Sequence, residues 1–194
     1  MKHASSRGWR LSGALAALAL AVAAAPATGQ DKPETYNATA SVKTAAGATM
    51  TAPVVITIDR WTNDADREKA VAALKAGGTT GLQKQLAGTP AVGTLQVGEV
   101  KAPLHFARAL PVGGGKVVTV VTSKPVFYVG AGAPDAKAKA GYDVAVVLFQ
   151  VDAAGKGDVG DFAPAAKVKM DDRGALVTED YGAEAVRLEG IAKK

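Results

Sequence analysis

The chain has 194 residues, a formal net charge of +5 and no cysteine. The lack of cysteine excludes disulfides and thiolate metal sites, and the length is that of one domain behind a short leader.

The first thirty residues have the pattern of a secretory signal peptide. A basic start with Lys2, Arg7 and Arg10 precedes an apolar run, which ends in small residues at the spacing that a signal peptidase reads. The run is shorter than the roughly 20 apolar residues of a spanning helix. We therefore expect cleavage between Ala27 and Gln30 and no stable membrane anchor afterwards.

These features predict a signal peptide at 1–29 and a single β-rich domain at 30–194, exported to the periplasm or the extracellular space. The Ala- and Gly-rich composition suggests a bacterial source. Without the leader, 20 basic and 18 acidic residues remain. Nucleic-acid binding needs a clustered basic face, so we expect no nucleic-acid partner.

The mature chain opens with the alternation of antiparallel strands. Residues 36–44 predict a first strand, 44–53 a turn and 54–61 a second strand. Along the second strand, the alternate residues 54, 56 and 58 are expected to face the core.

The hydrophobic period then changes to that of a helix. Asn63 can cap this helix, with Asp66 three residues on as a capping-box variant. The pair Gly77-Gly78 ends a first helix and Gly88 a second. We expect an αα insertion at about residues 64–87.

After Pro90 the period returns to two, and short turns join the remaining strands. Residues 125–142 are expected to be irregular and to contain a mobile loop, and the strand at 142–152 is apolar on both faces, as a central strand would be. The predicted fold is mainly β: an antiparallel meandering sheet of about nine strands, curled into a barrel or clamshell. Further strands are expected at 92–100, 104–112, 116–123, 162–171, 175–180 and 184–191, with turns at 101–103 and 172–174.

Four short motifs follow one another along the chain: I-x-R-W-T-x-D-x-x-R from Ile58, L-H-F-A-R from Leu104, V-T-S-K-P from Val121 and D-x-x-G-K-G from Asp152. This order resembles an uncharacterised family of secreted bacterial β-rich proteins. The resemblance implies export and the domain boundaries, and it implies no activity. Ser123-Lys124 departs from the Asp-Arg pair expected there.

Three segments look like cofactor or metal motifs but are predicted to be turns. The sequence GKGDVG at 155–160 matches G-x-G-x-x-G, yet an alternating segment follows it where a dinucleotide site needs a helix. The sequence VGGGKVV at 112–118 lacks the residues of a phosphate-binding loop. The acidic residues at 152, 158 and 161 lack the spacing of a calcium loop. We expect no cofactor and no metal.

His105 is the single histidine of the mature chain, which excludes zinc sites with two or three histidines. A Ser-His-Asp triad would have to use it, and no G-x-S-x-G is present. We predict no catalytic residue. If a turn at 101–103 pairs Val100 with Leu104, Glu99 lies opposite His105 as a cross-strand partner.

The candidate binding residues are Arg108, His105, Trp61 and Arg60. Arg108 shares a predicted strand face with Leu104, Phe106 and Leu110, so it either lines a barrel interior or pairs with an acid at the rim. Trp61 is expected to pack the helices onto the sheet at the strand–helix corner, and Arg60 stands beside it.

From these patterns we expect a non-enzymatic exported module that binds a small molecule or a partner protein of the cell envelope. Two alternatives remain open: a cofactor-independent hydrolase or isomerase that uses Asp, Glu and Arg, and a structural or inhibitory protein-interaction domain. A large apolar cavity would favour ligand binding, and a filled core with one exposed apolar patch would favour a protein partner.

Overall fold

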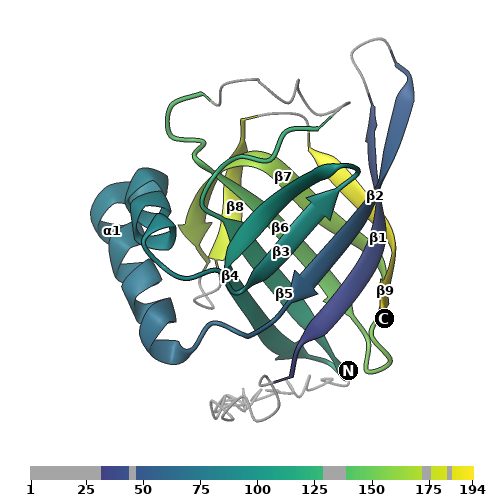
Figure 1. Ribbon diagram of the computed structural model, residues 1–194, viewed down its shortest axis with the longest axis horizontal. Coiled ribbons are helices and arrows are strands. Elements are labelled where there is room, and N and C mark those ends of the chain that lie inside the picture. Colours follow the sequence, from purple (N-terminus) through teal and green to yellow (C-terminus); the bar gives the residue numbers. More distant parts are fainter. Residues whose placement is uncertain (1–31, 44–46, 129–138, 172–175, 183–184) are drawn as a thin grey trace, which may run out of the picture.

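The computed structural model describes residues 32–43, 47–128, 139–171, 176–182 and 185–194. Within these ranges the protein has nine strands and one helix (Figure 1). The elements are β1 (Glu34–Lys43), β2 (Thr49–Ile58), α1 (Asp64–Ala87), β3 (Gly93–Val97), β4 (Val100–Val112), β5 (Gly115–Thr122), β6 (Val144–Val151), β7 (Lys156–Met170), β8 (Leu176–Tyr181) and β9 (Val186–Lys193).

Eight of the strands form a closed antiparallel barrel, and β8 is an additional strand. The sheet order is β6-β5-β4-β3-β2-β1-β9-β7-β8, and pairing of β6 with β7 closes the barrel. The long strand β7 pairs with β9 through its first half and with β8 through its second half. The predicted barrel of about nine strands is confirmed.

Side chains fill the barrel interior. The predicted core face of β2, with Val54, Ile56 and Ile58, points into it. At one end, the rings of Tyr36 and Phe149 meet edge to face, with centroids 4.9 Å apart. All eight barrel strands contribute buried side chains to this core, so the interior is filled as in the small barrels that hold no ligand.

A second apolar layer covers part of the outside of the barrel. The outward residues Val144 and Val146 of β6 are buried in it, while the alternate residues of this strand face the interior. The prediction of a central strand with two apolar faces is therefore confirmed. Helix α1 covers this outer layer with Ala70, Leu74, Leu82 and Leu86.

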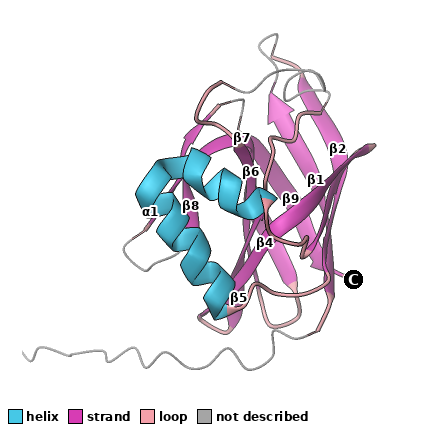
Figure 2. Ribbon diagram, turned by 60° about the vertical axis from the view of Figure 1, so that its left-hand side comes forward, coloured by secondary structure: helices cyan, strands magenta, loops and turns pink. Residues whose placement is uncertain are grey.

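The helix forms two arms, as Figure 2 shows. The Asn63 side chain accepts a hydrogen bond from the backbone N–H of Asp66 at 2.8 Å and caps the first arm. The kink lies at Gly77 and Gly78, and Gly78 has a φ of 60° and a ψ of −155°, a conformation open essentially only to glycine. The predicted αα insertion at 64–87 is confirmed.

The predicted turn at 101–103 is wrong and the one at 44–53 extends too far, and in each case a proline lies inside a strand. Strand β4 begins at Val100 and includes Pro103, so the β3–β4 turn lies at Gly98 and Glu99 instead of at 101–103. Similarly, β2 begins at Thr49 and includes Pro53. Each proline stands just before the residue at which its strand begins to pair with a second strand: β2 pairs with β3 from Val54, and β4 pairs with β5 from Leu104. At the prolines one side of the strand is therefore unpaired, and a proline is tolerated there.

Of the two glycine-rich turns, the one between β4 and β5 is confirmed. Gly113 and Gly114, both with positive φ, connect β4 to β5. Gly155, with a φ of 79°, ends the turn before β7, and residues 156–160 already belong to this strand. The predicted turn at 155–160 is therefore wrong in extent, and the G-x-G-x-x-G segment forms a strand and no helix. The predicted signal peptide, most of the predicted mobile loop and the hairpin at 172–174 lie outside the described residues.

Candidate functional site

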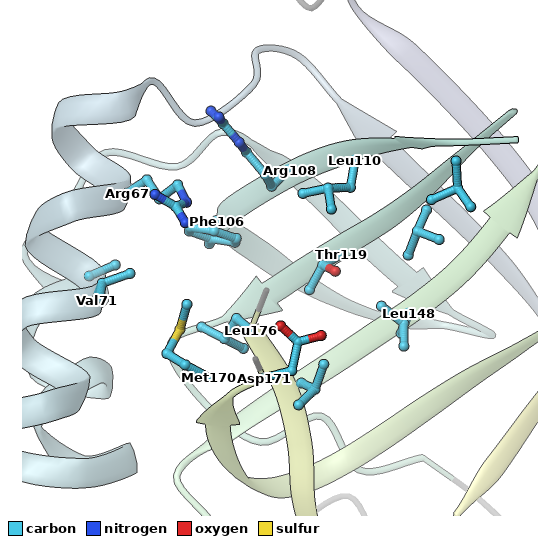
Figure 3. A pocket seen from close by; sticks show the side chains of 14 residues that line it. Arg67, Val71, Phe106, Arg108, Leu110, Thr119, Leu148, Met170, Asp171 and Leu176 are labelled. Carbon is cyan, nitrogen blue, oxygen red and sulfur yellow. The ribbon is translucent and has the colours of Figure 1, made fainter. Parts of the chain in front are cut away.

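A groove lies between the first arm of α1 and the outer face of the barrel, and we call it the α1 groove (Figure 3). Its volume is about 220 Å³. Helix α1, strands β4 to β8 and Asp171 after the end of β7 contribute side chains. The lining comprises Arg67, Ala70, Val71, Phe106, Arg108, Leu110, Val112, Val117, Thr119, Leu148, Met170, Asp171, Leu176 and Val177.

The groove exists because the helix covers the outer apolar face only in part. Phe106 is buried in the layer beneath α1. Further along the same strands, the outward side chains of Leu110, Val117 and Leu148 remain half-buried. Apolar side chains that no other described element covers therefore form the floor of the α1 groove.

Arg108 stands at the edge of this groove and not in the barrel interior. A register irregularity between Leu104 and Phe106 places Leu104 in the interior and Phe106 in the layer beneath α1. Arg108 follows on the outer face. The predicted common face is therefore wrong for Leu104, because a bulge in the strand reverses the alternation, while Phe106, Arg108 and Leu110 do share the outer face.

The partner of Arg108 is the first residue of α1. Its Nη2 donates to the carboxylate of Asp64 at 2.7 Å, and its Nη1 donates to the carbonyl oxygen of Thr62 at 3.0 Å. The Arg108 side chain is 21% exposed and that of Asp64 is 80% exposed. Of the two alternatives that the sequence left open for Arg108, the structure thus has the ion pair with an acid at the rim. This pair links the start of the helix to β4.

The other charged side chains of the groove are Arg67 and Asp171. In Figure 3, the carboxylate of Asp171 points toward Thr119, and Arg67 lies beside Phe106. Arg67 and Asp171 each have an interaction partner. The α1 groove thus combines an apolar floor with charged groups that already have partners.

A buried ionic cluster closes one end of the barrel. The Glu34 carboxylate, 8% exposed, accepts hydrogen bonds from Lys116 Nζ at 2.6 and 2.8 Å, from Lys193 Nζ at 2.8 Å and from the Tyr36 hydroxyl. Burial raises the pKa of Glu34, but the donors from Lys116, Lys193 and Tyr36 outweigh it, so the net pKa lies below the usual range. Burial, together with the bond to Glu34, raises the pKa of the Tyr36 phenol.

Sequence reasoning missed this ionic cluster. Its residues come from β1, β5 and β9, far apart along the chain. Only the closure of the barrel brings them together, and no local pattern marks them.

Trp61 packs at the same end of the barrel. Its ring is 7% exposed and belongs to the interior core, with Lys116 Nζ 5.2 Å from the ring centroid. Burial agrees with the predicted packing role, but the ring packs inside the barrel instead of beneath the helix. Its neighbour Arg60 is exposed and donates to the carbonyl oxygens of Pro90 and Ala91 at 3.0 and 3.4 Å.

His105 is not paired with Glu99. Glu99 lies in the β3–β4 turn, which moves it away from the expected cross-strand position. The imidazole Nδ1 instead lies 2.9 Å from the carbonyl oxygen of Thr89, and because that oxygen can only accept, Nδ1 donates. Of the four predicted site residues, only Arg108 lines the α1 groove.

Across the described ranges, no three histidine, aspartate or glutamate side chains gather as potential metal ligands. In the same residues, no helix is long and apolar enough to cross a membrane.

Comparison of the chain with models of protein families, with curated proteins and with solved structures finds no match.

Proposed function

We propose that the protein is an exported, non-enzymatic binding module that takes a small apolar molecule into the α1 groove. The observation that carries the proposal is the apolar floor of this groove, which the folded chain leaves partly uncovered. Ligand sites are mostly concave and apolar with a few polar groups at fixed places. The α1 groove has this composition, whereas the barrel interior is filled by its own side chains.

The volume supports a ligand of modest size. An engineered apolar cavity of about 150 Å³ binds benzene, and the α1 groove measures about 220 Å³. A single ring with a short substituent, or a compact bicycle such as indole, is therefore the size class that we propose.

The charges at the rim favour an apolar ligand over an ionic one. Arg108 is held by Asp64 and the Thr62 carbonyl oxygen, so an anion would have to displace an existing partner. The lining contains one carboxylate, that of Asp171, and no histidine. An acid–base enzyme of the kind considered from the sequence would use two carboxylates with separated pKa values, which supports binding rather than catalysis here.

The test is an NMR titration with indole as the probe. A Val71→Trp variant places a large side chain in the groove from the half-exposed face of α1, and Ala72→Trp adds the same side chain at an exposed neighbouring position outside the lining. We expect Val71→Trp to weaken indole binding by on the order of tenfold or more, because the added ring occupies the site. Ala72→Trp should bind as the wild type does.

Equal affinities for the three proteins would contradict the proposal, as would an absence of indole binding by the wild type. Thermal unfolding of both variants checks that each has kept its fold.

A further inference from the structure

A second cleft lies where β4, the end of β5 and the segment 123–127 that follows β5 meet the last residue of α1, and we call it the basic cleft. It measures about 800 Å³ and shares no lining residue with the α1 groove. Among its lining residues are Lys101, Pro103, His105, Ser123, Lys124 and Phe127.

Charge distinguishes this cleft from the α1 groove. Its lining contains two lysines and a histidine but no aspartate or glutamate. Within the part of the chain that the structure describes, the ammonium groups of Lys101 and Lys124 have no hydrogen-bond or ion-pair partner. By contrast, Lys116 and Lys193 are both engaged by Glu34. The basic cleft thus presents positive charge that no described carboxylate neutralises.

His105 adds an oriented polar group to the cleft. Donation from Nδ1 to the Thr89 carbonyl oxygen fixes the orientation of the ring. Among the described residues Nε2 has no partner, so it is the ring nitrogen that remains for a ligand, as an acceptor in the neutral ring and as a donor to an anion in the imidazolium form. The strand bulge between Leu104 and Phe106 is what leaves both His105 and Phe106 outside the barrel core.

Apolar groups complete the lining. Pro103, Val126 and Phe127 surround the polar groups, and Val126 is held by its backbone N–H donating to the Pro164 carbonyl oxygen at 2.8 Å. A cleft of this volume lies within the range that takes ligands of drug size.

We infer that the basic cleft is a second binding site, for an amphipathic anion. The acidic group of the ligand contacts Lys101 and Lys124, and its apolar body rests on Pro103 and Phe127. The inference is independent of the proposed function, because the two sites share no residue and take ligands of different charge.

Fluorescence titration with 8-anilinonaphthalene-1-sulfonate tests this inference, with uncharged N-phenyl-1-naphthylamine as the matched probe. The double variant Lys101→Gln/Lys124→Gln should weaken sulfonate binding by on the order of tenfold, because it removes two charged donors. It should leave binding of the uncharged probe unchanged. The control Lys75→Gln/Lys169→Gln removes two exposed lysines from other surfaces and should bind both probes as the wild type does.

Two further variants test whether the sulfonate binds in this cleft. His105→Asn keeps an N–H near the Thr89 carbonyl oxygen but removes Nε2, which donates to an anion only in the imidazolium form, so it should weaken sulfonate binding in acid and not at alkaline pH, without lowering the melting temperature. Val71→Trp blocks the α1 groove and should leave sulfonate binding intact, which separates failure of this inference from failure of the proposed function. Sulfonate affinity that is unchanged in the Lys101→Gln/Lys124→Gln variant, or reduced equally in the lysine control, would overturn the inference.

Discussion

Replacing Glu34 by glutamine should destabilise the protein more than any surface charge substitution. The Glu34 carboxylate is 8% exposed and accepts hydrogen bonds from two lysines and a tyrosine. Glutamine has nearly the same shape, so the packing of the barrel end is retained while the negative charge is lost. The substitution therefore isolates the electrostatic contribution of the cluster.

The magnitude follows from the exposure of the partners. Removing one member of a fully buried ion pair costs about 3–5 kcal/mol. Lys116 and Lys193 are 26% and 39% exposed, so both ammonium groups can regain water in the variant. We therefore expect Glu34→Gln to lower the free energy of unfolding by roughly 2–3 kcal/mol at pH 7.

Urea denaturation at several pH values provides the measurement. The pKa of Glu34 is lowered in the folded state from a reference of 4.5, so its stabilisation is present above about pH 4.5 and is lost as the pH falls through the folded-state pKa. The difference between wild type and Glu34→Gln should accordingly narrow in acid. As a control, Glu189→Gln alters a pair with Arg187 in which both side chains are more than half exposed, and it should change stability by less than about 1 kcal/mol. A Glu34→Gln variant as stable as Glu189→Gln at pH 7 would refute the reasoning.

Four other predictions follow from the same structure and sequence. Trp61→Ala should cost roughly 3–5 kcal/mol, because the ring fills the barrel end, and an unchanged urea midpoint would show that the ring contributes no packing. Gly78→Ala should lower the free energy of unfolding by about 1–3 kcal/mol, whereas Gly77→Ala, at a negative φ with no atom within 4 Å of the added Cβ, should cost less than about 1 kcal/mol; similar losses for both would argue against strain at the kink. N-terminal sequencing of the exported protein should find a start between Ala27 and Gln30, and a mature chain that begins at Met1 would contradict cleavage. Millimolar calcium should leave the melting temperature unchanged, and a rise of several degrees that a chelator reverses would reveal a calcium site.

The strands and the helix were predictable because their signals are local. Alternation of apolar residues marks β2 and β6, and the cap at Asn63 with the Gly77-Gly78 pair marks the two arms of α1. The errors at Pro53 and Pro103 arose because proline is typical of turns. Whether proline can stay in a strand depends on the neighbouring strands, and the local sequence does not specify these.

The sites were less predictable than the fold because they depend on long-range geometry. Arg108 was correctly singled out as an unusual charge, but the bulge after Leu104 that sets its face has no clear sequence signal. The Glu34 cluster joins three strands that are distant in sequence. The α1 groove results from how far the helix extends over the outer apolar face, which periodicity alone does not determine.

The most direct test of the α1 groove is a methyl-region NMR spectrum recorded with and without indole. Strand β5 offers an internal comparison, because Val117 lines the groove whereas Val118 and Val120 face the barrel interior. If indole binds in the α1 groove, the methyl signals of Val71, Val117 and Leu148 should shift with one common affinity, and those of Val118 and Val120 should move little. Shifts that centre on Val118 and Val120, or no saturable shifts at Val71 and Leu148, would contradict the proposed site.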